Sequence, residues 1–164
     1  MIDGLLIHNS SDLRKPGHEY LEDWLTSLRD KRLVKRVGVS IYESSDLEGI
    51  RLDLLDLVQL PLSLYDQRLL VDGTIRKLRE QGCAVHARSI YLQGLIVNSS
   101  NYWPNWVKPS IRNHHFMLER FSRDRGCDLI ECALGFAREQ EDLEAVVVGI
   151  CLLYTSPSPR DATL

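Results

Sequence analysis

The chain of 164 residues fits one domain of ordinary size, and its 44% of hydrophobic residues suffices for a sizeable core. The formal net charge of −3 shows none of the basic excess of a nucleic-acid binder or of a protein held on an anionic membrane. The N-terminus lacks the basic and apolar regions of a signal peptide, and no apolar run approaches the roughly 18 residues that would span a bilayer. We therefore expect a cytoplasmic protein that binds neither nucleic acid nor membrane.

Short apolar runs alternate with segments of helical period along the chain. In order, we expect a strand over 4–8, a helix over 18–30, a strand over 33–39, a short helix with a candidate capping box at Ser45 and Glu48, a strand over 55–60, a helix over 71–81, a strand over 83–87, a long aromatic loop over 94–109, helices over 110–125 and 128–140, and a strand over 145–149. Strands that alternate with helices are typical of βαβ units, which build a parallel sheet.

Two of the expected helices carry apolar side chains at a spacing that places them on one face. These residues are Tyr20, Leu21, Trp24, Leu25 and Leu28 in the helix over 18–30, and Val71, Ile75 and Leu78 in the helix over 71–81.

The four cysteines are Cys83, Cys127, Cys132 and Cys151, and no two of them have C-x-x-C spacing. The first three lie inside apolar runs, so we interpret them as buried, reduced thiols of a cytosolic protein. A metal site or a disulfide is the alternative.

The last stretch, residues 151–164, departs from the strand–helix alternation. Its sequence CLLYTSPSPRD looks like the translation of a transposase-type adapter used in sequencing libraries. We interpret residues 1–150 as the domain and residues 151–164 as a non-native tail; the alternative is a genuine tail rich in Ser and Pro.

Polar side chains follow most of the expected strands. In parallel α/β folds the ligand lies at the carboxyl ends of the strands. The residues at these positions are His8, Ser40, Gln59, Arg88, Ser89 and Gly149. A histidine at a strand end is more often structural than catalytic, and a lone glutamine is more often a core hydrogen-bonding group. The series at successive strands, rather than any single residue, therefore indicates a site.

The remaining histidines and the short motifs add no second site. His18, His86, His114 and His115 lie on expected helices or in the body of a strand, and we interpret them as structural or solvated. The phosphate-binding patterns G-x-G-x-x-G and G-x-x-x-x-G-K-[ST] are absent, and so is the G-x-S-x-G of α/β-hydrolases. A doubly wound dinucleotide fold and a hydrolase thus have no local support.

Taken in order, several segments resemble the aldo-keto reductase family. They are Asp3-Gly4-Leu5-Leu6-Ile7-His8, which resembles the fourth barrel strand; Val37-Gly38-Val39-Ser40, the fifth; Val58-Gln59-Leu60-Pro61 with the loop to residue 68, the sixth; Ala87-Arg88-Ser89-Ile90-Tyr91-Leu92-Gln93-Gly94-Leu95, the seventh in one bacterial branch; and Ala133-Leu134-Gly135-Phe136 with Val146-Val147-Val148-Gly149, the last helix and the eighth strand. The resemblance covers residues 2–150.

The resemblance implies an α/β fold over residues 1–150, namely part of a (β/α)8 TIM barrel with about five parallel strands and outer helices. It implies reduction of aldehydes or ketones by NADPH or NADH, without a metal and with a small carbonyl compound as substrate. In the family's tetrad of Asp, Tyr, Lys and His, the last is matched by His8, which would orient and polarise the carbonyl. Ser40 and Gln59 match residues that hydrogen-bond the nicotinamide carboxamide, and Ser89 matches a residue near the cofactor pyrophosphate.

The chain also departs from the family pattern. Ile41 replaces an Asn that many members use at the carboxamide, and Arg88 replaces a Tyr that stacks on nicotinamide; a guanidinium plane can also stack, but it carries a charge. The Asp, Tyr and Lys of the tetrad lie on strands before the first one here, so we expect the chain alone to be inactive.

Two alternatives to a reductase remain. One is a binding or regulatory subunit with the same fold but no catalysis. The other is an unrelated parallel barrel acting on a phosphorylated substrate, which predicts a Gly-rich phosphate loop that the sequence lacks. The aromatic loop with Tyr102, Trp103 and Trp106 either lines a substrate pocket or packs on the barrel rim. Substrate, preference between NADP and NAD, and oligomeric state do not follow from the sequence.

Overall fold

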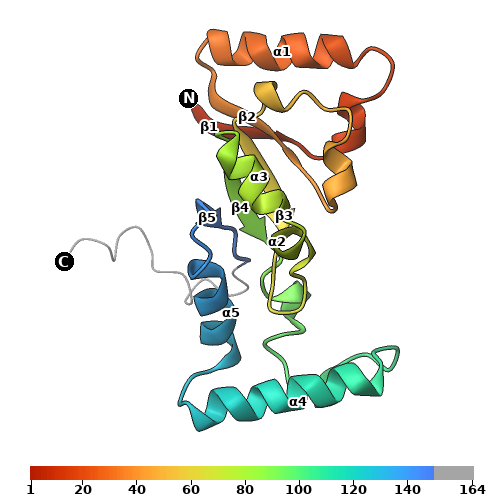
Figure 1. Ribbon diagram of the computed structural model, residues 1–164, viewed down its shortest axis with the longest axis vertical. Helices are drawn as coiled ribbons and strands as arrows, with labels where there is room; N and C mark the ends of the chain where they lie inside the picture. The colour runs from red at the N-terminus through yellow and green to blue at the C-terminus, as the bar shows by residue number, and fades with distance from the viewer. Residues whose placement is uncertain (150–164) are drawn as a thin grey trace, which may run out of the picture.

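The computed structural model describes residues 1–149, which form a five-stranded sheet with helices around it (Figure 1). The strands are β1 (Ile2–Ile7), β2 (Val34–Ser40), β3 (Leu57–Pro61), β4 (Ala84–Arg88) and β5 (Ala145–Val146). The helices are α1 (His18–Asp30), α2 (Arg68–Val71), α3 (Thr74–Glu80), α4 (Pro109–Asp124) and α5 (Leu129–Arg138). The proposed tail, residues 151–164, lies outside the described residues.

Neighbouring strands of the sheet all run parallel, in the order β1-β2-β3-β4-β5. Helical segments connect them along the chain, as in βαβ units. The predicted α/β fold of about five parallel strands with outer helices is confirmed. Within residues 1–149 none of the helices has both the length and the apolar content needed to cross a membrane.

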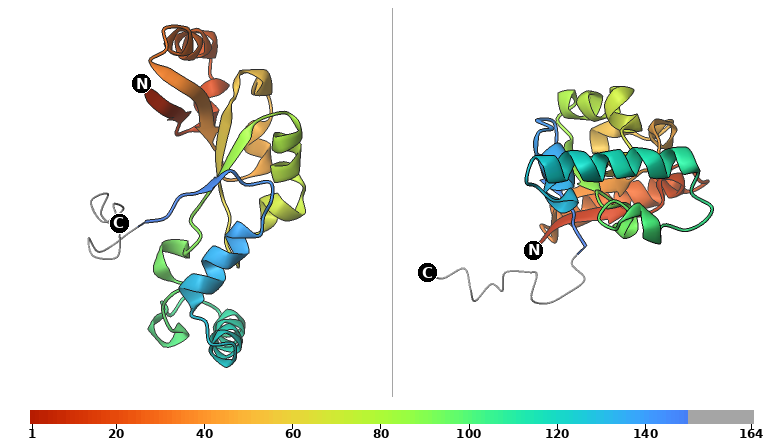
Figure 2. Two further views of the ribbon diagram at one scale, coloured as in Figure 1. Left: turned by 90° about the vertical axis from the view of Figure 1, so that its left-hand side faces the viewer. Right: turned by 90° about the horizontal axis from the view of Figure 1, so that it is seen from below.

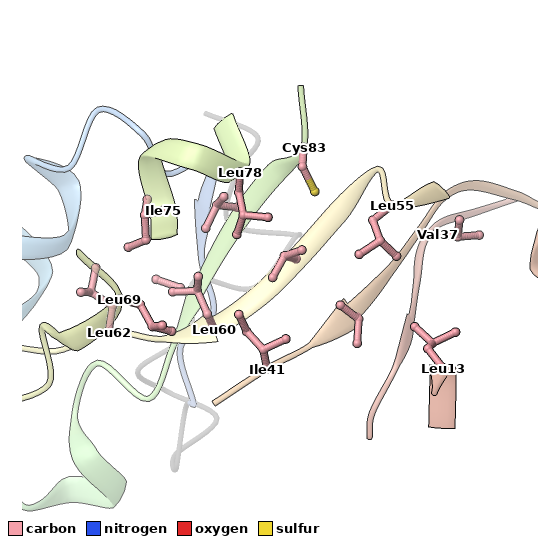
Figure 3. Packing of buried hydrophobic residues seen from close by; sticks show 14 of the residues in the cluster. Leu13, Val37, Ile41, Leu55, Leu60, Leu62, Leu69, Ile75, Leu78 and Cys83 are labelled. Atoms are coloured by element: carbon pink, nitrogen blue, oxygen red, sulfur yellow. The ribbon is translucent and has the colours of Figure 1, made fainter. Parts of the chain in front are cut away.

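The hydrophobic core lies between one face of the sheet and the helices that follow the strands (Figure 3). Val39, Val58 and Leu60 point from the strands into this core and are fully buried. Ile75 and Leu78 of α3 meet them from the other side. Because each fully buried side chain of this size contributes about 1.5–3 kcal/mol, this face holds the sheet and its helices together.

The helix α1 buries only part of its expected apolar face. Leu25 is 4% exposed, and Leu21 and Leu28 are partly buried against the core. Tyr20 and Trp24, however, are 82% and 51% exposed. The sheet therefore covers a narrower arc of the helix than the five-residue pattern predicted.

The helix expected over residues 71–81 is interrupted at Gly73. Gly73 has a φ of 81°, far outside the α-helical range, so α2 ends at Val71 and α3 begins at Thr74. The Asp72 carboxylate accepts a hydrogen bond of 2.9 Å from the Thr74 backbone N–H and thereby stabilises the new start. Val71 is 81% exposed, whereas Ile75 is fully buried, so the prediction that they share one apolar face was wrong.

Two further local predictions need correction. The short helix after β2 spans Ser44–Leu47. The predicted capping box of Ser45 and Glu48 does not stabilise its start. Instead, Asp46 accepts hydrogen bonds from the backbone N–H groups of Tyr42 (2.7 Å) and Glu43 (3.1 Å). The last strand is shorter than the predicted 145–149, although the Val147 N–H still donates to the Ala87 carbonyl at 2.7 Å. The other strand boundaries lie within two residues of those expected.

One buried tryptophan packs the aromatic loop against α4. Trp103 is 6% exposed and lies 4.4 Å, centroid to centroid, from the ring of His115 on α4. His115 is fully buried and bridges the Tyr65 hydroxyl (2.8 Å) and the Asn98 carbonyl oxygen (3.0 Å). If Nε2 of His115 donates to the carbonyl, then Nδ1 accepts from the Tyr65 hydroxyl. His115 is thus structural, as interpreted from the sequence.

The other two aromatic residues of this loop are not core. Tyr102 and Trp106 are 85% and 76% exposed. Beside them the Arg112 guanidinium donates to the carbonyl oxygens of Ser100 (2.7 Å) and Trp103 (2.9 Å). The loop is therefore held mainly through its backbone and one buried ring, at the end of the molecule opposite α1 (Figure 2).

The cysteines differ from one another in burial. Cys83 is buried at 3% exposure, as expected, but Cys127 and Cys132 are only half-buried. They lie at the junction of α4 and α5, where the chain turns, and not in the core. The expectation of three buried thiols was wrong for these two.

Candidate functional site

The side chains singled out from the sequence lie at or near the carboxyl ends of β1 to β4, and the carboxyl ends of parallel strands share one edge of the sheet. Ser40 and Gln59 are paired residues of β2 and β3. His8 directly follows Ile7, whose partner across the β1–β2 ladder is the residue before Ser40. Arg88 ends β4 and pairs with Pro61 of β3. Backbone pairing therefore brings His8, Ser40 and Gln59 to neighbouring positions on this edge, with Arg88 one step beyond.

Ser40 and Gln59 point to the face of the sheet opposite the core, because their neighbours Val39 and Val58 belong to the core. Ser40 is 4% exposed, whereas Gln59 is half-buried. The amide of Gln59 therefore stays accessible from this face of the sheet, the inner face, which lies opposite the helices. A primary amide both donates and accepts hydrogen bonds, and a hydroxyl does the same. Side by side, the two match the donor and acceptor pattern of a carboxamide.

Gly38 permits the close contact of β2 and β3 just before these two residues. A Cβ at this position would lie 1.8 Å from the Leu57 carbonyl oxygen and 2.9 Å from Cδ2 of Leu6. Any side chain here would force the strands apart. The register that joins Ser40 to Gln59 therefore depends on glycine.

Ile41 lies on the other face of the sheet. It is fully buried within the hydrophobic core beside Leu60 (Figure 3). Its side chain is thus part of the packing against the helices and offers no polar group to the inner face.

Arg88 is engaged with the protein on two sides. Its guanidinium carbon lies 4.2 Å from the centroid of the Tyr42 ring, and one of its nitrogens donates to the Ile41 carbonyl oxygen at 3.1 Å. A second nitrogen is 3.4 Å from Oγ of Ser89. Tyr42 is 54% exposed, so this cation–π pair forms part of the surface at the carboxyl edge.

The loop after β4 has an unusual backbone. Ser89, Leu92 and Gln93 have φ of 62°, 46° and 55°, a region that side-chain-bearing residues rarely adopt. Each such residue costs on the order of 1 kcal/mol or more and tends to persist at ligand-binding sites. Ser89 is exposed here, so its hydroxyl and backbone are accessible at the edge.

The charged and titratable residues on the inner face were not predicted from the sequence. His86 pairs with Gln59 across the β3–β4 ladder, so the two side chains lie next to each other on the inner face. Nε2 of His86 lies 3.1 Å from the Glu144 carboxylate, which also accepts a hydrogen bond from Arg36 at 2.5 Å. The bonds from Arg36 and His86 lower the pKa of Glu144, and those from Arg36 and Lys35 lower the pKa of Asp3.

The contacts of Arg36 and His86 with Glu144 link β2 and β4 to the segment before β5, which is distant from β2 in sequence. Only the strand register shows that these residues meet. The period-two spacing of His86 and Arg88 nevertheless indicated, in the sequence, that the two share one face of their strand. Within residues 1–149 no group of three or more His, Cys, Asp or Glu side chains is arranged to hold a metal ion.

Two surface hollows lie away from the carboxyl edge. One is lined by residues of α1 and the segment before β3, including Leu25 and Leu55, and the other by residues of α3 and the short helix after β2, including Leu47 and Leu78. Both lie on the side of the sheet that the helices cover, so neither contains the residues of the candidate site.

The structure is similar to a known structure, whereas the sequence alone matches none of the family models and curated proteins. The structure is similar to that of the glycerol dehydrogenase AKR11B4 from Gluconobacter oxydans, an aldo-keto reductase, with a TM-score of 0.68 and 19% sequence identity. The match covers 89% of this chain and 49% of that one, so the chain spans about half the length of the protein it matches. The fold of residues 1–149 is that of part of a (β/α)8 barrel.

Proposed function

We propose that residues 1–150 are the C-terminal part of an NAD(P)H-dependent oxidoreductase of the aldo-keto reductase type, which reduces an aldehyde or ketone to an alcohol. The observation that carries this proposal is the pairing of Ser40 with Gln59 at the carboxyl edge of a sheet with this fold. In parallel barrels, active sites are built at that edge. A cytoplasmic location suits a protein with free thiols.

Each residue of the edge then has a role toward the cofactor. The Ser40 hydroxyl and the Gln59 amide would hydrogen-bond the nicotinamide carboxamide and fix which face of the ring meets the substrate. Ser89, in its left-handed backbone conformation, would contact the pyrophosphate. Arg88 would stack on the nicotinamide with the face of its guanidinium that Tyr42 does not cover. The bound cofactor supplies the hydride, and the protein supplies position and charge.

His8 would bind the substrate. Its position beside Ser40 is close to where the nicotinamide would lie, and an imidazole N–H there would donate a hydrogen bond to the carbonyl oxygen as negative charge develops on it. The Asp, Tyr and Lys that deliver and tune the proton belong, by resemblance, to strands that precede β1. We therefore propose that the chain alone lacks the proton donor and does not turn over.

Cofactor titration of the protein extended at both ends with its parental sequence tests this function. NADPH or NADH binding, followed by nucleotide fluorescence, is expected to weaken about three- to tenfold in Gln59→Ala, since one or two hydrogen bonds of about 0.5–1.5 kcal/mol each are lost. Gln81→Ala is the matched control, because Gln81 is exposed at the end of α3. Equal affinity in wild type and Gln59→Ala would contradict the proposed site. Cofactor binding without any carbonyl reduction would instead favour a regulatory subunit.

A further inference from the structure

Two cysteines meet at the turn between α4 and α5. The Sγ atoms of Cys127 and Cys132 are 3.3 Å apart, and both residues are half-buried. The turn is sharp because Gly126, just after the end of α4, has φ 69°. The thiol of Cys127 is also 3.4 Å from the Ser122 carbonyl oxygen on the last turn of α4. The sulfur pair is therefore held from both helices.

The start of α5 sets the distance between the two sulfurs. Asp128 caps the helix and accepts a hydrogen bond of 2.7 Å from the Glu131 N–H, while the Glu131 carboxylate accepts one of 2.9 Å from the Asp128 N–H. Cys127 precedes the cap, and Cys132 is the fourth residue of the helix. These are the two positions at which apolar side chains form a staple across a helix start. Here both staple residues carry thiols.

We propose that Cys127 and Cys132 form an intramolecular disulfide on exposure to a small-molecule disulfide, so that the α4–α5 turn is a redox-sensitive modification site. Formation of this disulfide does not depend on the proposed reductase function. The bond would join the first turn of α5 covalently to the turn that follows α4.

The chemistry balances in two exchanges. The Cys127 thiolate attacks one sulfur of the small-molecule disulfide, whose S–S bond breaks, and one thiol leaves with the proton that Cys127 gave up. The Cys132 thiolate then attacks the Cys127 sulfur and expels the second thiol. The protein loses two protons and two electrons, which together equal two hydrogen atoms, and the small disulfide takes them up to become two thiols.

The surroundings assign the order of the two attacks. Burial and the neighbouring Cys127 sulfur raise the pKa of Cys132 to about 11. Because little Cys132 is then present as thiolate, Cys132 is disfavoured as the first nucleophile. It is assigned the second, intramolecular attack, in which its closeness to the Cys127 sulfur compensates for the small thiolate fraction. The sulfurs need to approach by only about 1 Å, since a disulfide bond is about 2.05 Å long.

Cys83 provides an internal contrast. It is 3% exposed, and burial raises the pKa of its thiol to about 11. Within residues 1–149 no second sulfur lies beside it, and a reagent has little access to it, so it should stay a thiol under the same conditions.

Peptide mapping of the full chain after incubation with oxidised glutathione tests the proposal. Trypsin places Cys127 and Cys132 together in peptide 126–138, whereas Cys83 lies in peptide 80–88 and Cys151 in another. We expect peptide 126–138 to become lighter by two hydrogen atoms and to resist alkylation until a reductant is added. In Cys132→Ser, Cys127 should instead retain one glutathione. Two alkylatable thiols, or a separate glutathione on each cysteine of the wild type, would overturn the proposal.

A capping variant separates the effect of the fold from mere closeness in sequence. Asp128→Ala removes the hydrogen bond that fixes the start of α5, and the ratio of internal disulfide to glutathione adduct should fall severalfold. An unchanged ratio would show that the structure does not direct the reaction and would overturn the proposal equally.

Discussion

Gly38→Ala tests the geometry on which the candidate site rests. The added Cβ would lie 1.8 Å from the carbonyl oxygen and 2.7 Å from the carbonyl carbon of Leu57. Both atoms are backbone, so no side-chain rotation relieves the clash. The strands β2 and β3 must separate, or the ladder that pairs Gly38 with Leu57 must break.

The expected cost is large for a single methyl group. Overpacking a core site costs about 1–3 kcal/mol, and a rigid backbone neighbour places this variant at the upper end, about 3 kcal/mol. A lost ladder hydrogen bond adds about 0.5–1.5 kcal/mol. With a urea slope of about 2 kcal/mol per molar, the unfolding midpoint should fall by about 2 M.

Urea unfolding followed by tryptophan fluorescence measures the shift, since the chain has three tryptophans. Gly135→Ala is the matched control: Gly135 lies inside α5, and its added Cβ would have no atom within 4 Å. That substitution should stabilise the protein by about 0.5–1 kcal/mol. Placing Gly38→Ala in the Gly135→Ala background keeps the measurement accessible. A free energy of unfolding for Gly38→Ala within about 0.5 kcal/mol of wild type would refute the close approach of the strands.

Two further predictions concern the buried pair that holds the aromatic loop. Tyr65→Phe leaves Nδ1 of His115 buried without its 2.8 Å partner and should destabilise the protein by about 1–3 kcal/mol. The control Tyr20→Phe, at an exposed site, should be neutral in the same urea assay. Equal unfolding midpoints for the two variants would contradict the described bond. Burial lowers the pKa of His115 from 6.5 despite the nearby Glu119, so the unfolded chain binds the proton more readily and stability should be full above pH 6.5 and fall as the pH drops below it. His115→Gln should flatten that part of the stability profile, and an unchanged slope would assign it to other groups.

The strands were predictable because each is a short apolar run, and those runs also locate the carboxyl edge. His8, Ser40 and Gln59 could be named for that reason alone. His86 could not, since its position beside Gln59 depends on the register between strands far apart in sequence. The pairing of Cys127 with Cys132 likewise needs the turn geometry.

The errors in the helices have local causes. Spacing alone joined Val71 to Ile75, although Asp72-Gly73-Thr74 contains the signal for a break: a glycine, free to adopt positive φ, between a capping side chain and the residue it caps. In α1 the periodicity counted Tyr20 with Leu25, but the width of the contact with the sheet decides which of them is buried.

A carbonyl-reduction assay with NADPH and with NADH tests the central claim most directly, on the 164-residue chain beside a version extended at both ends with parental sequence. We predict no measurable turnover by the chain alone, because the proposed function assigns the groups that deliver and tune the proton to strands before β1. We predict turnover by the extended protein. Turnover by the chain alone at a rate near that of the extended version would contradict the account.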